Sequence, residues 1–491
     1  MPEEAQTKTN GDEAAKRELK EQTPVTTRHE ATIRGQTLTY DVTAGLMPLR
    51  NAKDEIEAQI FFVAYVLDRA EGVAPRPLTF AFNGGPGSSS IWLHMGALGP
   101  KRVHLNPDGT MPPPPFRLVD NDETWLAETD LVFIDPVGTG YSRAATPELE
   151  EKYYGYKGDI ESVGEFIRLY LTRYQRWSSP LFLAGESYGT LRAAGLAGHL
   201  VERGIALNGI TLVSAVLSYA TLDMWAAGHN DLPYTLFLPS FAATAWYHKR
   251  LSEAHQARDL TDFLDEVEQY ALGDYLLALV RGDALGDDER AEVIRRVADY
   301  TGLEERFVDN SNLRIQIMRF CKELLRDEKR TVGRLDSRFT GVDALAVTEM
   351  PEVDPSMVHP GAPFTAMVND YLRGALKFES DLIYETLSMA VNQKWKFDSV
   401  RNGYLDTSAP LRTAFNRNPH LKVLVAYGYY DLATPYYAIQ YTMNHLGLEP
   451  SRRDDIRYAA YEAGHMMYID DACREQFRED IVAFYHDALP G

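Results

Sequence analysis

The chain has 491 residues, 45% of them apolar and 25% charged, a profile typical of globular proteins rather than of disordered or collagen-like ones. Its 50 basic and 71 acidic residues give a formal net charge of -21 with no basic footprint, which argues against nucleic acid and anionic membranes as partners. No apolar run approaches the roughly 18 residues that span a bilayer.

The N-terminal segment is polar and charged up to about residue 30, and we expect it to be a flexible tail. It has no apolar run followed by a small-residue cleavage site. We therefore expect a cytoplasmic protein, or a secreted or periplasmic one whose leader has been removed. Beyond this segment, residues 31–42 and 58–67 alternate or are continuously apolar, and each range is expected to form one strand.

Further apolar segments along the chain predict strands that alternate with helices. The segments are residues 78–83, 130–135, 180–185, 209–214, 422–428 and 456–462. Residues 159–177 repeat apolar side chains at helical spacing and predict a helix capped by Asp159. This alternation predicts an α/β fold with a mostly parallel central sheet flanked by helices on both faces.

A long middle region has a different pattern, with amphipathic segments and little strand signal. Helices are expected over residues 260–282, 287–302 and 312–330. The expected organisation is, in chain order, a tail over 1–30, the first part of an α/β core over 31–219, a helical insertion over 220–395 that shapes the substrate pocket, and the second part of the core over 396–491.

The sequence Gly-Glu-Ser-Tyr-Gly at residues 185–189 fits the pattern G-x-S-x-G. An apolar strand segment precedes it and a helix-like segment follows it. In that context the serine hydroxyl projects from a sharp strand-to-helix turn, and the glycines are small because the turn is crowded. Ser187 is therefore the candidate nucleophile, and a glycine-rich turn with an idle serine is the structural alternative.

A serine hydroxyl is a weak nucleophile at neutral pH and needs a base and a group that orients the base. In chains with this motif the order is Ser, then Asp or Glu, then His. Asp431 and His465 each follow a late strand segment, where loops leave the carboxyl edge of a parallel sheet. We therefore predict that His465 is the base and Asp431 the orienting acid. The acids that compete with Asp431 for this role are Asp454, Asp455 and Glu462.

The stretch FNGGPGSSS, residues 82–90, combines glycines, serines and a proline directly after a strand segment. A loop at this place in the chain supplies one backbone N–H to the oxyanion hole, and the residue after the nucleophile, here Tyr188, supplies the other. Glycines let backbone amides approach a reacting carbonyl without an intervening side chain. We therefore expect the backbone of this loop to take part in the reaction.

Taken in chain order, the segments NGGPGSSS, LVFIDPVGTGYS, GESYG, DLATP and GHM resemble the motifs of the serine carboxypeptidase family. The resemblance covers residues 31–220 and 395–491, and residues 238–251 are similar to the helical insertion of bacterial-type members. It implies an α/β-hydrolase fold. It also implies an enzyme that hydrolyses the C-terminal peptide bond of peptides through an acyl-enzyme on Ser187.

The resemblance also implies a role for each motif residue. Ser187 resembles the nucleophile, His465 the base and Asp431 the orienting acid of the family. The backbone amides of Gly85 and Tyr188 resemble its oxyanion hole.

Three further positions match those that hold the terminal carboxylate of the substrate in this family: Asn83, Gly84 and Glu186. The match is chemically reasonable because a carboxamide and a protonated Glu186 can both donate hydrogen bonds to a carboxylate. Two ionised carboxylates side by side would repel each other. Peptide binding is therefore expected to be best at acidic pH.

Three positions depart from the family pattern. Ser88 stands where the family often has cysteine, so the disulfide made there is absent. Ala97 stands where a glutamate often partners the carboxylate-binding acid, which weakens the expectation of acid-shifted binding. Residues 428–431 are Gly-Tyr-Tyr-Asp instead of GDxD, and the acid of the triad is kept.

Other functions stay open alongside the carboxypeptidase. A proline iminopeptidase-like aminopeptidase also has a GGPG loop, but it would need an acidic group for the substrate ammonium. An esterase or acyltransferase could use the same triad, and Ala97 is compatible with that alternative. A catalytically inactive binding protein is disfavoured because all three residue types of the triad are present.

No metal or organic cofactor is implied by the sequence. Cys321 and Cys473 are two free thiols or one disulfide. Peptides are the expected partners, and the oligomeric state is open, with a homodimer included. Side-chain specificity does not follow from the sequence because it depends on loops such as 104–118 and 141–156 and on the insertion.

Overall fold

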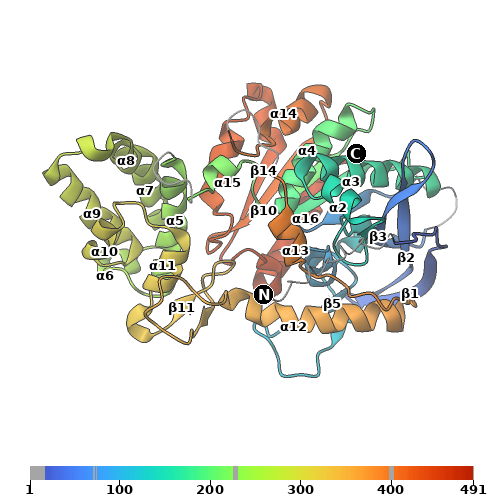
Figure 1. Cartoon of the computed structure of the whole chain (residues 1–491), viewed down its shortest axis with the longest axis horizontal. Helices are drawn as coiled ribbons and strands as arrows, with labels where there is room; N and C mark the ends of the chain where they lie inside the picture. The colour runs from blue at the N-terminus through green and yellow to red at the C-terminus, as the bar shows by residue number, and fades with distance from the viewer. Residues whose placement is uncertain (1–16, 70–71, 73, 225–229, 398–402, 490–491) are drawn as a thin grey trace, which may run out of the picture.

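The computed structural model describes residues 17–69, 72, 74–224, 230–397 and 403–489. A central sheet organises this part of the chain (Figure 1). Its strands are β1 (Val25–Ile33), β2 (Gln36–Arg50), β3 (Ile56–Leu67), β4 (Leu78–Phe82), β7 (Asp130–Ile134), β8 (Arg143–Ala144), β9 (Leu181–Ser187), β10 (Gly209–Ala215), β13 (Lys422–Gly428) and β14 (Ile456–Tyr461).

The strand order is β1-β2-β3-β7-β4-β9-β10-β13-β14, with β8 beside β3. The strands from β7 to β14 in this order are parallel, whereas β1, β2 and β3 form an antiparallel edge. Because β9, β13 and β14 are parallel, the loops that leave their carboxyl ends meet at one edge of the sheet. This edge carries the candidate site.

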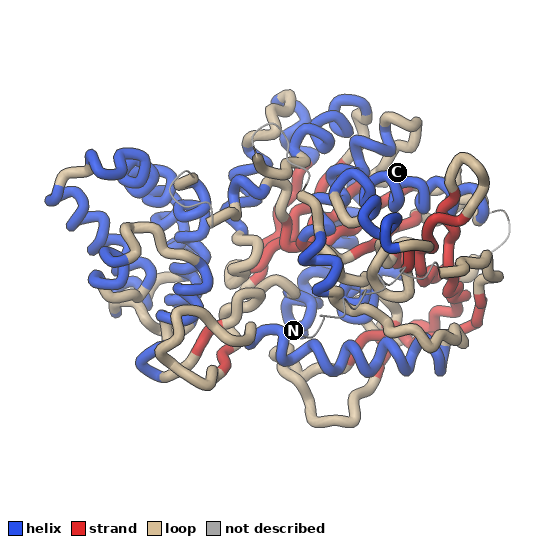
Figure 2. Tube along the Cα trace, in the orientation of Figure 1, coloured by secondary structure: helices blue, strands red, loops and turns tan. Residues whose placement is uncertain are grey.

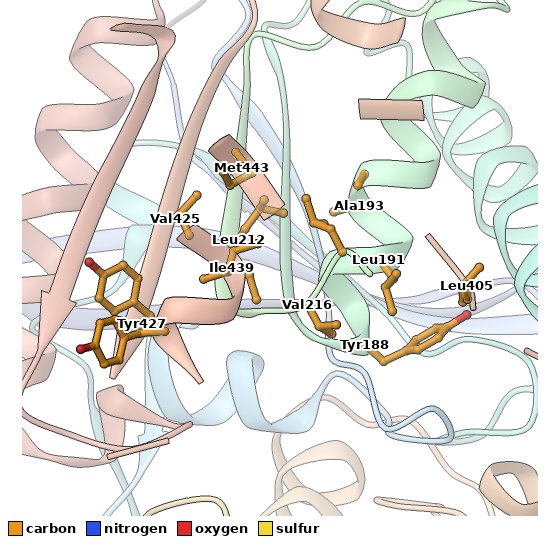
Figure 3. Close-up of a cluster of buried hydrophobic side chains, with 14 of the residues drawn as sticks. Tyr188, Leu191, Ala193, Leu212, Val216, Leu405, Val425, Tyr427, Ile439 and Met443 are labelled. Carbon is orange, nitrogen blue, oxygen red and sulfur yellow. The ribbon is translucent and has the colours of Figure 1, made fainter. Parts of the chain in front are cut away.

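Helices cover both faces of the sheet. They include α3 (Tyr156–Arg173), α4 (Tyr188–Val201), α14 (Ser408–Arg417), α15 (Tyr436–Asn444) and α16 (Asp471–Ala488). Successive strand side chains point to opposite faces. Leu183 accordingly packs in the apolar cluster that includes α3 and α4, and Phe182 in the cluster that includes α16. Figure 3 shows part of the first cluster, where Leu191 from α4 and Ile439 from α15 lie near Leu212 from β10.

Helices also dominate the described residues between 230 and 397, as Figure 2 shows. They are α5 (Leu232–Tyr247), α6 (Glu253–Gln256), α7 (Leu260–Tyr270), α8 (Leu276–Arg281), α9 (Asp287–Thr301), α10 (Glu305–Asn310), α11 (Ile317–Glu323), α12 (Pro355–Asp370) and α13 (Met389–Lys394). Helices α5 to α11 form a lobe beside the sheet, and α5 packs against α15 (Figure 1). The expected boundaries between the core and the helical insertion stay a prediction.

Two short strands, β11 (Thr331–Val332) and β12 (Thr340–Gly341), pair with each other after α11. The loop between them, residues 333–339, reaches the candidate site. A second small pair is formed by β5 (Lys101–Val103) and β6 (Leu118–Asp120).

The predicted strands over 58–67, 78–83, 130–135, 180–185, 209–214, 422–428 and 456–462 are confirmed within one to two residues at their ends. The single strand expected over 31–42 is wrong. A turn at Arg34 and Gly35, with φ of 46° and 78°, divides this region between the hairpin strands β1 and β2. Because β1 begins at Val25, the tail expected up to residue 30 is also wrong at its end, and residues 1–16 lie outside the described residues.

Three helix predictions also need correction. Helix α3 begins at Tyr156 after Gly155, so Asp159 does not cap it; this carboxylate is buried and pairs with Arg192 at 2.8 Å. The helix expected over 260–282 is divided by a π-helical turn at Ala271–Tyr275. In the range 312–330, α11 covers only Ile317–Glu323: residues with positive φ, Asn312 and Leu313, precede it, and a 3-10 turn at Arg326–Glu328 follows it.

Candidate active site

Ser187 lies at the strained junction between β9 and α4. Its backbone has φ of 59° and ψ of -129°, a region that non-glycine residues rarely adopt. The neighbouring glycines leave no space for side chains: a Cβ on Gly185 would lie 2.3 Å from the carbonyl oxygen of Gly189. The sharp strand-to-helix turn that the G-x-S-x-G motif predicts is therefore present, and Ser187 directly precedes the N-terminus of α4.

Asp431 and His465 meet at the carboxyl edge of the sheet. Nδ1 of His465 lies 2.7 Å from Oδ2 of Asp431, and the two side chains are almost completely buried. The backbone N–H groups of Ala433 and Thr434 donate to Oδ1 of Asp431 at 2.7 and 3.0 Å. These bonds fix the carboxylate, so it can orient the imidazole ring and leave Nε2 as the basic nitrogen.

The surroundings of His465 favour its charged form. Burial alone would lower the pKa of His465, but the adjacent Asp431 carboxylate outweighs burial and raises this pKa above its ordinary value. Among the competing acids, Asp455 pairs with Lys422 at 2.7 Å and with Arg452. Of the predicted acids, Asp431 is the one that the structure places against His465.

The glycine-rich loop after β4 lies directly against the turn of Ser187. A Cβ on Gly84 would lie 2.4 Å from the backbone nitrogen of Tyr188, and Gly85 has a φ of 101°. Only glycine fits such a close approach of two backbones. The structure therefore brings Gly84 against Tyr188, and Gly85 lines the same cavity as both.

The end of the helical region holds this loop in place. The backbone N–H of Ser388 donates to the carbonyl of Gly87 at 2.8 Å, and that of Ser89 donates to Thr386 at 3.1 Å. The side chain of Asn392 donates to the carbonyl of Pro86 at 3.0 Å. The glycine-rich loop is thus bonded to residues 386–392.

Glu186 is the buried acid of the site, with 3% of its surface exposed. Its Oε2 accepts hydrogen bonds from the Asn83 amide at 2.9 Å and from the Tyr468 hydroxyl at 2.7 Å. Burial raises the pKa of Glu186 to about 7, so the side chain is neutral in weakly acidic solution. Asn83 is held in turn, because its Oδ1 accepts the N–H of Leu93 at 3.0 Å.

Tyr468 is a site residue that the sequence did not predict. Its ring lies against the segment that contains Ala97, since a Cβ on Gly96 would be 2.7 Å from Cε2 of Tyr468. Burial keeps the pKa of Tyr468 well above its ordinary value, so its hydroxyl stays protonated and donates to Glu186. Its position three residues after His465 is the one sequence signal that could have drawn attention to it.

The predicted residues share one cavity of about 410 Å³. All of them line it except Asp431, which lies behind His465: Asn83, Gly84, Gly85, Glu186, Ser187, Tyr188 and His465. A second cavity of about 620 Å³ adjoins the first, and the two share Tyr219, Leu222, Arg334 and Ala433 in their walls. The site is therefore large enough for a substrate that extends in two directions from Ser187.

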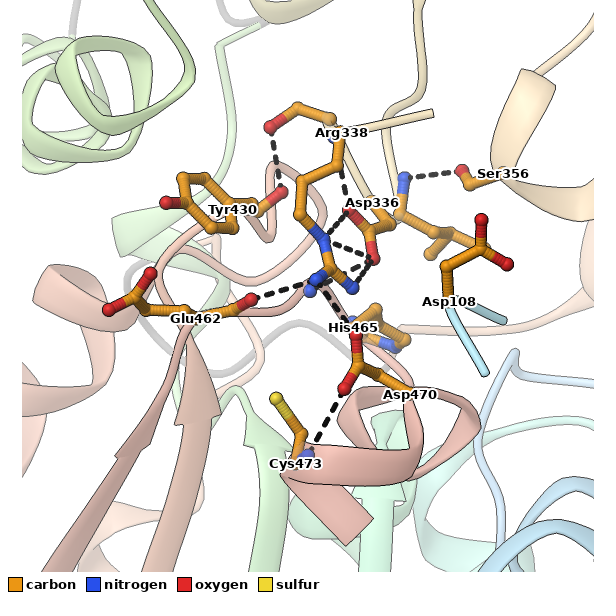
Figure 4. Close-up of polar contacts among 12 residues, drawn as sticks. Asp108, Asp336, Arg338, Ser356, Tyr430, Glu462, His465, Asp470 and Cys473 are labelled. Atoms are coloured by element: carbon orange, nitrogen blue, oxygen red, sulfur yellow. Dashed lines mark hydrogen bonds and ion pairs between the residues drawn. The ribbon is translucent and has the colours of Figure 1, made fainter. Parts of the chain in front are cut away.

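Residues 333–339 of the helical region contact the loops that contain Asp431 and His465, and we call this segment the clamp; Figure 4 shows part of it. The carbonyl of Leu335 accepts the N–H of His465 at 2.7 Å, and Asp336 accepts the N–H of Gly464 at 3.1 Å. The N–H of Ser337 donates to the carbonyl of Tyr430 at 3.0 Å. The clamp therefore contacts the residues that precede both Asp431 and His465.

Arg338 is the charged centre of the clamp (Figure 4). It pairs with Asp336 at 2.8 Å and with Asp470 at 3.2 Å, and it donates to the carbonyl of Glu462 at 2.8 Å. Asp470 caps the N-terminus of α16. These residues could not be predicted from the sequence, because no motif surrounds them.

The remaining sequence expectations concern cysteines and metals. Cys321 and Cys473 are free thiols and both are buried. Ser88 accepts the indole N–H of Trp92 at 2.9 Å, a hydrogen bond at the position where the family often has a cysteine. Within the described ranges, no cluster of His, Cys, Asp or Glu could hold a metal ion, and no helix has the length and apolarity needed to cross a bilayer.

Comparison with known proteins connects this geometry to one family. The family model described as serine carboxypeptidase matches residues 35–471. The chain is 31% identical over 138 residues to serine carboxypeptidase-like 3 of Arabidopsis thaliana, a match over 28% of the chain and 30% of that relative. It is 32% identical over 156 residues to the pheromone-processing carboxypeptidase KEX1 of Saccharomyces cerevisiae, over 30% of the chain and 20% of that relative. The matched segment thus spans less than a third of each curated relative.

Among solved structures, the prohormone-processing carboxypeptidase Kex1 of Saccharomyces cerevisiae has a TM-score of 0.58 and 16% identity, over 91% of this chain and 92% of that one. At this identity the likeness shows the fold. Together with the sheet order and the turn at Ser187, it confirms the predicted α/β-hydrolase fold.

Proposed function

The chain belongs to the serine carboxypeptidase family, and on this premise we propose that it is a serine-type carboxypeptidase acting on peptides. The observation that carries the proposal is Glu186, a buried acid beside the nucleophile with a pKa of about 7. A neutral carboxyl group can donate a hydrogen bond to the terminal carboxylate of a peptide, as can the Asn83 amide. A hydrolase that acts on internal bonds or simple esters has no need of such a group.

In the proposed mechanism, Nε2 of His465 takes the proton of Ser187 as its hydroxyl attacks the last peptide carbonyl. Asp431 holds the ring and stabilises its charged form. The developing oxyanion is bound by the backbone N–H groups of Gly85 and Tyr188, and loss of one such donor typically costs about 3–4 kcal/mol of transition-state stabilisation. The leaving amino acid takes a proton from His465, and water then releases the acyl-enzyme.

The proposed carboxylate site consists of Asn83, Gly84 and Glu186. The pKa values of Glu186 and His465 set opposite limits on activity. Below about pH 7 Glu186 is neutral and able to donate, whereas His465 must lose its proton to act as a base. We therefore expect the KM for peptides to rise above pH 7 and kcat to fall as the solution becomes more acidic.

A second candidate function is an esterase, and Tyr468 is the observation that favours it. The hydroxyl of Tyr468 donates to Glu186 and so stabilises its ionised form. A second acid at the position of Ala97 would instead share a proton with Glu186 and keep the pair partly protonated. An ionised Glu186 would repel a terminal carboxylate but would tolerate an uncharged ester.

The deciding experiment measures amino acid release from an N-blocked dipeptide, from its C-terminal amide and from its methyl ester, at pH 4 to 8. We expect release from the free acid, weak or no release from the amide, and none of either with Ser187→Ala. Hydrolysis of the ester alone would support the esterase. Hydrolysis that requires a free N-terminus would support the aminopeptidase alternative.

We also propose that the chain is a bacterial-type member of the family and that it is located in the cytoplasm. The similarity of residues 238–251 supports a bacterial-type member of the family, and a family tree that places the chain among the plant and yeast sequences would contradict this. The free thiols of Cys321 and Cys473 are compatible with a cytoplasmic location, which cell fractionation would test.

A further inference from the structure

The two adjoining cavities indicate how a bound peptide would lie in the active site. Asn83 and Glu186 line the first cavity and not the second, which begins at Tyr219 and Ala433. If the terminal carboxylate of a peptide lies at Glu186 and its last carbonyl at Ser187, the rest of the peptide must extend away from Glu186. The second cavity, which adjoins the first, offers the space for this part of the peptide.

Arg334 stands where the two cavities meet, and its side chain is exposed. Its backbone is fixed on both sides, because its N–H donates to Asp354 at 3.0 Å and its carbonyl accepts the N–H of Leu432 at 3.0 Å. Its guanidinium group makes no hydrogen bond or ion pair with any residue in the described part of the chain. Arg334 therefore presents a guanidinium that has no partner among the described residues, on a backbone that is held where the two cavities meet.

The walls around Arg334 are mainly apolar. The second cavity is lined by Tyr219, Leu222, Phe237, Ile317, Met318 and Leu405, with Asp223 as its carboxylate. In the first cavity, the Asp354 carboxylate is already bonded to the N–H groups of Arg334 and Ser356. A guanidinium beside apolar walls is suited to bind a carboxylate through charge-assisted, bidentate hydrogen bonds.

We propose that Arg334 selects peptides with an acidic side chain on the penultimate residue, the residue that becomes the acyl group on Ser187. This inference rests on the proposed carboxypeptidase function and names its substrate class. It assigns to Arg334 a role in specificity that is distinct from recognition of the terminal carboxylate.

The test compares three N-blocked dipeptides that end in leucine and carry Glu, Gln or Lys as the penultimate residue. Glu and Gln have nearly the same shape, so the ratio of their kcat/KM values reports the charge. We expect a ratio of about five in favour of Glu at low salt, the upper range for a solvent-accessible charge pair. Arg334→Gln should bring the ratio close to one, and Arg334→Glu should make Lys the preferred residue.

The matched control is Arg295→Gln, which removes the same charge from an exposed ion pair on α9. It should leave the Glu-to-Gln ratio as in the wild type. An unchanged ratio in Arg334→Gln would overturn the inference. An equal loss of activity toward all three peptides in that variant would also overturn it, because it would assign Arg334 to the terminal carboxylate. If the wild type releases leucine from none of them, the proposed function fails first, and this inference with it.

Discussion

At the scale of single residues, burial raises the pKa of Glu186, and the hydrogen bond from Tyr468 is one of the contacts that lower it again. The bond stabilises the ionised form of Glu186 and therefore lowers its pKa, against the larger effect of burial. In Tyr468→Phe the pKa of Glu186 should rise above 7, so the acid stays neutral to higher pH. The rise of KM with pH for a free-acid dipeptide should move to higher pH by about one unit, the size of shift that one lost charge-assisted bond gives.

The control for Tyr468→Phe is the C-terminal amide of the same dipeptide. It has no carboxylate, so whatever binding it shows should depend on pH in the same way in variant and wild type. A KM profile of the free acid that moves to lower pH would contradict the assigned role of Tyr468.

A substitution at Gly84 tests whether the glycine-rich loop supplies a donor to the oxyanion hole, as we propose. A methyl group at this position would overlap the backbone nitrogen of Tyr188, at 2.4 Å, and backbone cannot move aside cheaply. Gly84→Ala should therefore displace one of the two N–H donors and lower kcat by about 100- to 1,000-fold. Gly361→Ala is the matched control, because an added Cβ on α12 would have no neighbour within 4 Å. Activity close to the wild type in Gly84→Ala would show that the loop can adjust.

The site residues differ in how far the sequence could predict them. Ser187, His465 and Glu186 lie in short sequence motifs that are associated with a particular local backbone conformation. Tyr468 and Arg334 act through contacts that depend on the folded chain: the Tyr468 hydroxyl reaches a carboxylate 282 positions away. No local pattern records such a contact, so these residues become visible only with the structure.

At the scale of elements, the clamp joins the helical region to the catalytic loops. Its centre, Arg338, is mostly buried and neutralises two carboxylates, Asp336 and Asp470. Asp336 in turn holds the N–H of Gly464, next to His465. Arg338 is thus a positioning residue that acts on the base through Asp336 and the backbone.

Arg338→Gln should lower kcat by about 10- to 100-fold, because a misplacement of about 1 Å at the reacting groups can cost that much. KM should change little, since the carboxylate site lies on other elements. Arg338→Lys should recover part of the loss, because it restores the charge but not the two-pronged geometry. A loss of stability with an unchanged kcat for the folded fraction would contradict a positioning role. Arg373→Gln, at an exposed ion pair, is the control.

The elements that the sequence predicted well are those with a single strong signal. Strands β4, β9 and β10 are almost entirely buried and mostly apolar, which gives them a clear strand signal in the sequence. The hairpin of β1 and β2 looks like one strand in the sequence because Arg34 gives no turn signal beside its glycine. Asp159 resembles a cap because acids favour helix starts, but its carboxylate forms a buried ion pair with Arg192.

At the scale of the whole molecule, the helical lobe and the sheet share one apolar core. A continuous cluster of buried side chains includes Phe241 and Phe320 from the lobe as well as Leu212 and Val425 from the sheet. The clamp and residues 386–392 add polar bonds from the same region to the catalytic loops. An insertion connected in this way should not unfold independently of the site.

This connection predicts that damage deep in the lobe removes activity and structure together. Phe320 is completely buried and stacks on Phe241, with ring centroids 4.1 Å apart. Phe320→Ala should destabilise the protein by about 3–5 kcal/mol, the usual effect of removing a buried ring. The midpoints of thermal unfolding measured by far-UV circular dichroism and by residual activity should fall by the same amount. Leu277→Ala, an exposed position on α8, should move neither midpoint. If the lobe were an independent unit, Phe320→Ala would instead split the unfolding transition in two and leave the midpoint for activity unchanged. In that case the sheet alone would hold Ser187, Asp431 and His465 in place.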